Sequence, residues 1–284
     1  MDLPFKINLT GKVAVVTGGS GVLGSVFSRS LAKAGAKVAV LARSEDKIDA
    51  VVKDIKASGG EAAGFSVDVL NKQALEKIHE DIKHKLGPCS ILINGAGGNN
   101  PEATTTKEYF NTEDLNDPSL KSFFDLESET INELFNLNFL GALLPTQVFA
   151  QDMVSKEKSS TIINVSSMNA YTPLTKIPAY SGAKAAISNF TQWLAVHFSK
   201  TNIRVNALAP GFFLTEQNKN LMINDNGELS ERANKIISQT PMERFGKPEE
   251  LIGTLLWLVD QKSSSFVNGI VVPVDGGFSS YSGV

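Results

Sequence analysis

The sequence is poor in cysteine and histidine, the residue types that most often build disulfide frameworks and metal sites. Cys89 is the single cysteine, so an intrachain disulfide is excluded, and its apolar neighbours predict a packed core thiol rather than a nucleophile. The 3 histidines show no spacing that is typical of metal ligands. We therefore expect a protein without structural disulfides and without a metal.

Long apolar runs and basic stripes are also missing. No stretch approaches the roughly 18 consecutive apolar residues of a membrane span, and residues 1–10 lack the basic start and apolar run of a signal peptide. The formal net charge is −3, with acidic and basic residues well mixed. Because nucleic-acid binding needs a clustered basic face, a polyanionic partner is not expected. These absences predict a soluble cytoplasmic protein with neither membrane nor nucleic acid as a partner.

β-branched runs alternate with segments of helical periodicity along most of the 284 residues. The expected strands lie at 12–16, 37–41, 64–67, 91–93, 161–165, 204–211 with its turn, and 269–274. The expected helices include a segment ending at Ala34 and the segments 45–57, 72–85, 128–153, 180–197 and 248–259. Such β-α units predict a Rossmann-type, doubly wound parallel sheet of about seven strands, with helices on both faces, in a single domain 1–284.

The first strand runs directly into a glycine-rich turn that opens a helix. This turn contains the pattern Gly19-x-Gly21-x-x-Gly24. Glycines there allow a tight turn and let backbone N–H groups approach a pyrophosphate, which the positive end of the helix attracts. The order of strand, turn and helix therefore predicts a dinucleotide site.

The end of the second strand bears on the choice of cofactor. An acidic residue that binds the adenosine ribose is expected there, but the chain has Ala42-Arg43. A small residue followed by arginine leaves room for a 2′-phosphate and supplies a matching guanidinium. Arg43 thus favours NADP(H), with NAD(H) possible; alternatively it is only a solvated residue at the start of the next helix.

Polar residues follow the ends of several other strands. Asp68-Val69 and the turn Asn94-Gly-Ala96-Gly97 lie where ligands of doubly wound sheets bind, although Asp68 could equally cap a helix and Asn94 could simply form a turn. Ser167 follows the strand at 161–165. Asn138 is a polar residue within an apolar helical stretch, and it could instead be an asparagine that distorts the helix and binds water.

Tyr180 and Lys184 stand four residues apart in an expected helix. Positions i and i+4 share one face, so the ammonium lies about one turn from the phenol. A nearby positive charge favours phenolate, which makes a tyrosine useful for acid-base chemistry near neutral pH. Chance pairs of this kind are common on helix surfaces, so the interpretation depends on the rest of the chain.

Two segments depart from the β-α rhythm. Residues 98–127 lack periodicity, as a functional lid or a disordered loop would, although their phenylalanines argue for partial packing. The segment 212–240 is polar and predicted to be helical on the substrate side.

Taken together, these motifs resemble the short-chain dehydrogenase/reductase family over essentially the whole chain. The resemblance implies that Tyr180 is the acid-base, that Lys184 lowers its pKa and holds the nicotinamide ribose, and that Ser167 polarises the substrate oxygen. It also implies that Asn138 fixes a water for proton relay and that the protein is a homotetramer. The cofactor contacts it implies are Thr17, Gly18, Ser20, Gly21, Leu23, Gly24, Arg43, Asp68, Val69, Asn94, Ala96, Gly97, Tyr180, Lys184, Pro210, Gly211, Phe213 and Thr215.

The chain departs from the family pattern in two places. Val22 occupies the middle glycine's usual position, with Gly21 before it, and the interval from Asn94 to Asn138 is 44 positions (138 minus 94), which is longer than expected. The longer interval places the insert between a cofactor turn and a catalytic helix, from where it can reach the substrate.

Several segments further resemble the D-mannonate oxidoreductase (fructuronate reductase) branch, among them Asn94 to Pro101 and Ser167-Met-Asn-Ala170. We therefore expect NAD(P)-dependent interconversion of D-mannonate and D-fructuronate, with a gluconate or other polyol dehydrogenase as an alternative and a non-catalytic cofactor-binding regulator as a remote one. Candidate groups for the sugar-acid substrate, any of which could instead be solvated surface, are Asn99, Asn100, Asn169, Lys176, Gln217 and Arg232.

Overall fold

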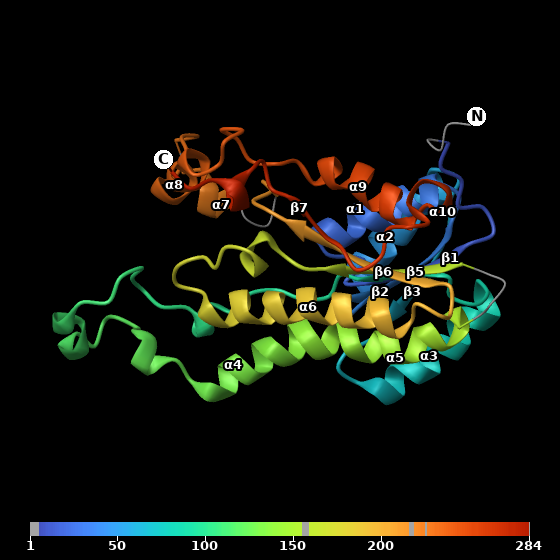
Figure 1. Ribbon diagram of the computed structural model, residues 1–284, viewed down its shortest axis with the longest axis horizontal. Coiled ribbons are helices and arrows are strands. Elements are labelled where there is room, and N and C mark those ends of the chain that lie inside the picture. Colours follow the sequence, from blue (N-terminus) through green and yellow to red (C-terminus); the bar gives the residue numbers. More distant parts are fainter. Residues whose placement is uncertain (1–5, 155–158, 216–218, 225, 284) are drawn as a thin grey trace.

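One parallel sheet carries all seven strands of the described chain, in the order β3-β2-β1-β4-β5-β6-β7 (Figure 1). The structure is a computed structural model that describes residues 6–154, 159–215, 219–224 and 226–283. The strands are β1 (Val13–Thr17), β2 (Lys37–Ala42), β3 (Glu61–Ser66), β4 (Ile91–Asn94), β5 (Ser160–Val165), β6 (Ile203–Pro210) and β7 (Val271–Val274). The prediction of a doubly wound sheet of about seven strands is confirmed.

The central strands are buried on both faces, as their apolar runs predict. All five residues of β1 are buried, and β1 pairs with β2 on one side and with β4 on the other. The expected third strand began too late, because β3 pairs with β2 from Glu61 onward. Residues 61–63 combine one charged residue with two alanines, which have little strand propensity, so pairing with β2 decides their conformation.

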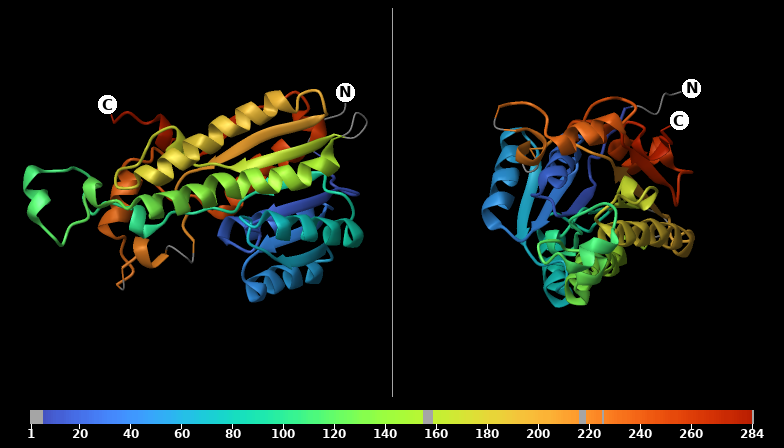
Figure 2. Two further views of the ribbon diagram at one scale, coloured as in Figure 1. Left: turned by 90° about the horizontal axis from the view of Figure 1, so that it is seen from below. Right: turned by 90° about the vertical axis from the view of Figure 1, so that its left-hand side faces the viewer.

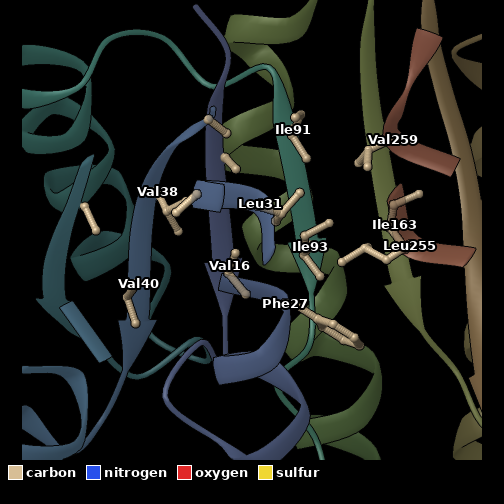
Figure 3. Packing of buried hydrophobic residues seen from close by; sticks show 14 of the residues in the cluster. Val16, Phe27, Leu31, Val38, Val40, Ile91, Ile93, Ile163, Leu255 and Val259 are labelled. Atoms are coloured by element: carbon tan, nitrogen blue, oxygen red, sulfur yellow. The ribbon is translucent and has the colours of Figure 1, made fainter. Parts of the chain in front are cut away.

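Helices cover both faces of the sheet (Figures 1 and 2). One layer contains α1 (Val22–Lys33), α2 (Glu45–Ala57) and α9 (Ile252–Val259). The other contains α3 (Lys72–Lys85), α5 (Gly141–Met153) and α6 (Pro178–His197). Figure 3 shows the packing under the first layer, where Phe27 and Leu31 of α1 meet valines and isoleucines of the central strands. Burial of these side chains stabilises the sheet and so holds the carboxyl ends of its strands in place.

The expected helix 128–153 is interrupted by a single wide turn. α4 (Ser128–Phe135) passes into a π-helical turn (Asn136–Leu140), after which α5 begins. A π-turn inserts an extra residue into the helical repeat and rotates the side chains that follow. Asn138 lies inside this turn, and its side chain contacts Gly98, which follows the end of β4.

The inserted segment 98–127 is an ordered arm that extends away from the body of the molecule (Figures 1 and 2). Its two limbs pair where Thr106 N donates to Lys121 O at 2.8 Å. Lys107 binds Asp114 at 2.6 Å, and Lys121 binds Glu102 at 2.6 Å. Short 3-10 turns lie at Pro101–Ala103, Thr112–Asn116 and Phe123–Asp125. Hydrogen bonds and ion pairs between its own residues therefore hold the arm together, and its role as a lid stays a prediction.

The segment that follows β6 is less helical than expected. Its described part contains only α7 (Lys219–Met222) and α8 (Glu231–Ser238). Outside this segment, a further short helix, α10 (Gln261–Ser264), follows α9. Gly227 at φ 83° lies between α7 and α8 and stops a continuous helix. Both short helices lie beyond the carboxyl ends of the strands (Figure 1).

Candidate active site

The carboxyl ends of β1, β4 and β5 meet at one place. The register pairs Thr17 with Asn94 and Asn94 with Asn164. Ligands of doubly wound sheets bind beyond these strand ends, where the strand order reverses. The predicted site residues on the three strands are therefore brought together.

The glycine turn forms a cradle that a side chain would fill. Gly18 has φ 64°, and a Cβ on it would lie 2.9 Å from the carbonyl oxygen of Gly95. A Cβ on Gly24 would lie 2.1 Å from the carbonyl oxygen of Gly18. α1 begins directly behind this turn, and its N-cap, Gly21, makes no side-chain capping hydrogen bond. The first backbone N–H groups of an α-helix have no partner within the helix and suit a pyrophosphate, so the cradle fits a dinucleotide.

The side chains of Thr17 and Asn94 hold the neighbouring turn at residues 94–97 in place. The Thr17 hydroxyl accepts hydrogen bonds from Gly95 N at 3.1 Å and Ala96 N at 3.2 Å. The Asn94 amide donates to Thr146 Oγ1 at 2.9 Å and to Asn164 Oδ1 at 2.8 Å, inside the protein. Both side chains therefore fix the turn at residues 94–97.

The residues that we expect around the adenosine lie in the glycine turn and just after the ends of β2 and β3. Arg43 is exposed, and its guanidinium has no partner within the part of the chain that the structure describes. Asp68 is exposed and accepts a hydrogen bond from Leu70 N at 2.9 Å, while Val69 is buried. Ser20 and Leu23, in and after the glycine turn, are half-buried. The cofactor roles of all five remain predictions.

The turn after β6 is held against the end of β7. Gly211 N donates to Val274 O at 3.0 Å, and a Cβ on Gly211 would lie 2.6 Å from the Cα of Asp275. Pro210 ends β6, and Thr215 is half-buried. Phe213 packs in the core with the α1 and α9 side chains, so any cofactor contact from it would come from its backbone.

Tyr180, Ser167 and Lys184 lie close together near the carboxyl end of β5. Lys184 Nζ lies 5.6 Å from the centre of the Tyr180 ring, as the four-residue spacing predicts. Burial raises the pKa of Tyr180, and its hydrogen bond with the Ser167 side chain lowers that pKa only in part. Tyr180 is consequently a protonated phenol at neutral pH, which suits a proton donor. The lowering of the Tyr180 pKa by Lys184, which the resemblance implies, stays a prediction.

Lys184 is buried with its ammonium held at the end of β5. Its Nζ donates to the carbonyl oxygen of Val165 at 2.9 Å, and burial lowers its pKa to about 8. Gly97 lies over this group, since a Cβ on Gly97 would approach Lys184 Nζ to 3.2 Å and Asn138 Oδ1 to 2.7 Å. The turn at residues 94–97 therefore packs directly on two of the four predicted catalytic residues.

Asn138 joins the catalytic helix to the root of the arm. Its Nδ2 donates to Gly98 O at 2.8 Å and to Leu134 O at 2.9 Å. Its Oδ1 accepts from Gly98 N at 3.2 Å. The side chain is 1% exposed, and its amide spans the π-turn and the arm. A water-fixing role for Asn138 remains a prediction beside this bridging role.

We expect the unfolding free energy to rise with pH above about 8 because of Lys184. Its pKa falls from 10.5 in the unfolded chain to about 8 in the folded one. Between these values the unfolded chain binds the extra proton, so stability increases with pH by up to about 3 kcal/mol. Urea unfolding at a series of pH values, compared with Lys184→Met, measures this difference. Parallel pH profiles for the two proteins would refute it.

The structure distributes the six expected substrate groups unevenly. Asn169 is 4% exposed beside Ser167, and its Oδ1 is buried without a partner among the described residues. Lys176 is half-buried at φ 70°. Asn99 and Asn100 bond within the arm, to Thr104 and to Glu102 N, and Arg232 is exposed on α8. Gln217 lies outside the described residues. Asn169 and Lys176 are thus the candidates nearest the predicted catalytic groups in sequence.

Sequence reasoning missed three groups that shape the site. Ala103 of the arm is 1% exposed and packs in the cluster that contains Tyr180. Thr105 N donates to the backbone oxygen of Lys176 at 2.9 Å. Val165 contributes only its carbonyl oxygen, to Lys184. Backbone partners and a small apolar side chain leave no pattern in the sequence that could have identified them.

No group of three or more histidine, cysteine, aspartate or glutamate side chains among the described residues could hold a metal ion. No helix in that part of the chain is both long and apolar enough to cross a membrane.

A doubly wound parallel sheet with a dinucleotide cradle beside a half-buried tyrosine and a buried lysine and serine indicates an oxidoreductase of the nicotinamide-dependent class. Comparison with known families agrees, because residues 12–226 match the short chain dehydrogenase model. The chain belongs to the short-chain dehydrogenase family of NAD(P)-dependent oxidoreductases.

Its relatives cover it from end to end. An uncharacterized oxidoreductase, UxuB, of Bacillus subtilis is 54% identical over 99% of this chain and 100% of its own length. A solved structure from Haemophilus influenzae, provisionally named a D-mannonate oxidoreductase and containing NAD, has TM-score 0.94 and 52% identity, with 100% of both chains covered. A gluconate 5-dehydrogenase from Burkholderia cenocepacia, in complex with NADP and tartrate, has TM-score 0.82 and 25% identity over 98% of each chain.

Proposed function

We propose that the protein interconverts D-mannonate and D-fructuronate with a nicotinamide cofactor. The observation that carries this proposal is the convergence of the half-buried Tyr180, Ser167 and the buried Lys184 beside the dinucleotide cradle. The Haemophilus influenzae structure supports the choice of substrate, since it is provisionally named for this activity and is 52% identical. The test is steady-state kinetics with fructuronate and related keto acids.

In this proposal Tyr180 supplies the proton of the reduction. A nicotinamide held by the cradle would supply the hydride to the keto carbon. The Ser167 hydroxyl donates a hydrogen bond to the oxygen on which negative charge develops, and Tyr180 gives that oxygen its proton. Because burial raises the pKa of Tyr180, the phenol still carries its proton at neutral pH.

Lys184 and Asn138 support the proton donor from behind. Lys184 is positioned by Val165 O to hold the nicotinamide ribose and to place a positive charge near Tyr180 as the phenolate forms. Asn138 keeps the arm's root against the π-turn, which places Gly97 over the ammonium. Removing Asn138 would therefore disturb two groups at once.

The carboxylate of the sugar acid needs hydrogen-bond donors, and we propose Asn169 and Lys176 for this role. Asn169 follows Ser167 by two residues and is buried, and Lys176 lies on the loop that leads to α6. We expect Asn169→Ala or Lys176→Ala to raise the Michaelis constant for fructuronate about tenfold, the value of one lost charged hydrogen bond. The anchoring idea fails if neither variant changes that constant.

For the cofactor, we propose that Arg43 binds a 2′-phosphate and thereby favours NADP(H). Its unpaired, exposed guanidinium at the end of β2 supports this, whereas the NAD in the Haemophilus influenzae relative supports the other cofactor. We expect Arg43→Ala to lower kcat/KM with NADPH at least tenfold, by loss of a charge-assisted pair worth about 1.5–3 kcal/mol. Kinetics with NADH serve as the internal control, and an equal loss with both cofactors would refute the assignment.

A gluconate or related polyol dehydrogenase is the second candidate. The Burkholderia cenocepacia structure supports it, since that protein is called a gluconate 5-dehydrogenase and shares the fold. A panel of sugar acids, polyols and apolar ketones, assayed by nicotinamide absorbance, separates the two. Faster turnover of gluconate than of mannonate would support this second activity.

The apolar face of α5 and α6 supports the predicted homotetramer. Val154, Trp193 and Val196 are 56%, 56% and 76% exposed there. Val154 and Trp193 line a groove together with Leu143, Phe190 and Phe198. Exposed apolar area of this kind is typical of subunit contacts.

A further inference from the structure

The root of the arm is fastened to one wall of the candidate site. Gly98 pairs with the Asn138 amide through both its N–H and its carbonyl oxygen. Ala103 packs among side chains of α4 and α6, including Tyr180. Thr105 N then donates to Lys176 O at 2.9 Å. These contacts tie the arm to the helix layer that carries the catalytic tyrosine.

The same arm is also fastened to the opposite wall. Lys235 on α8 donates to both carboxylate oxygens of Glu108, whose side chain is 23% exposed. This hydrogen bond raises the pKa of Lys235. α8 itself packs through Ala233 and Ile236 onto Phe212 and Leu214, which directly follow the cofactor turn at the end of β6. The arm therefore crosses the carboxyl edge of the sheet from α6 to α8.

We propose that Glu108 and Lys235 are positioning residues that fix α8 relative to Ser167 and Tyr180 and so set the width of the substrate cleft. This inference rests on the proposed function only in taking the Ser167 and Tyr180 hydroxyls as the place where the keto group binds. α8 has eight residues and buries only Ala233 and Ile236, so its own packing holds it weakly. The ion pair to the arm adds a second attachment to this packing.

Because the pair touches no reacting atom, its loss changes substrate binding rather than chemistry. Glu108→Gln keeps the shape of the side chain and removes its charge, and Lys235→Met does the same on α8. In either variant the KM for the keto acid rises about three- to fivefold while kcat stays within about twofold, as for loss of a favourable surface pair. Exchanging the charges, with Glu108→Lys and Lys235→Glu in one protein, restores the KM.

The matched control is Glu61→Gln, which breaks the exposed Lys37–Glu61 pair of 3.0 Å at the start of β2 and β3, the far end of the sheet. This variant leaves the KM unchanged. A change of KM in Glu61→Gln as large as that in Glu108→Gln, or failure of the exchanged pair to restore the KM, overturns the proposal.

Hydrogen exchange provides a readout that does not depend on turnover. Amides of residues 231–238 exchange faster in Glu108→Gln than in the wild-type protein or in Glu61→Gln, because α8 loses its attachment. Unchanged exchange in α8 overturns the proposal, and so does faster exchange with an unchanged KM. If the wild-type protein does not reduce fructuronate, the proposed function fails, and the KM comparison is made with the carbonyl compound that it does reduce.

Discussion

Replacing Tyr180 with phenylalanine lowers kcat for ketone reduction by about 10²- to 10⁴-fold, the usual contribution of a general acid. The substitution removes one hydroxyl from a ring that packs against Ala103, Ala179 and Ala183, so the fold should persist. Ser167 still binds the substrate oxygen, but no group delivers the proton. Steady-state kinetics, with cofactor binding measured by fluorescence titration, separates this loss of chemistry from a loss of binding.

The control for this substitution is Tyr281→Phe, because Tyr281 is 46% exposed near the end of the described chain. It should retain wild-type turnover. Near-normal turnover in Tyr180→Phe would mean that another group donates the proton, and the assignment of Tyr180 would then be wrong.

A single methyl group on Gly97 should also be damaging. Its Cβ would lie 2.7 Å from Asn138 Oδ1 and 3.2 Å from Lys184 Nζ, closer than either group tolerates without moving. Both groups are buried and hydrogen-bonded, so the shift reaches the nicotinamide ribose site and the π-turn together. We expect kcat/KM to fall about tenfold or more, because small shifts of positioned groups are costly, with a loss of about 1–3 kcal/mol in stability from overpacking.

Gly98→Ala is the matched control, because a Cβ on Gly98 would meet nothing within 4 Å. The two variants differ by one position in the same turn, so any general effect of alanine there appears in both. Equal kinetics for Gly97→Ala and Gly98→Ala would contradict the crowding that we infer at Lys184 and Asn138.

Local patterns were enough to predict most of what lies close together in the sequence. The Tyr180 and Lys184 pair depends only on the helical repeat, and the cradle at Gly18 and Gly24 depends only on a strand, a turn and a helix in order. The parallel sheet followed from the β-α alternation, because right-handed crossovers leave few other arrangements. These parts of the fold and site are encoded by short segments.

The arm and its contacts could not be predicted in this way. Glu108 and Lys235 are 127 positions apart, and Gly98 and Asn138 are 40 apart, so no local period connects them. The π-turn around Asn138 also has no sequence pattern of its own. Whether a helix takes up one extra residue depends on how α5 and α6 pack around it. Composition led us to expect more helix in 212–240, where Gly227 and tertiary contacts gave two short helices instead.

The pKa of Tyr180 shows a similar limit. The sequence placed a lysine beside the phenol and so suggested an easily formed phenolate, but it could not show how deeply both groups are buried. Burial raises the pKa of Tyr180 and lowers that of Lys184 to about 8. The lysine neighbour was predictable from the sequence, whereas the desolvation of both groups depends on the folded structure.

The most direct test of the central claim is the oxidation of NADH or NADPH by purified protein in the presence of fructuronate, followed by absorbance and by identification of the product. We predict turnover that yields mannonate and that falls to about 1% or less in Tyr180→Phe. Nicotinamide oxidation no faster than in Tyr180→Phe, or clearly faster turnover with an apolar ketone than with any sugar acid, would contradict it.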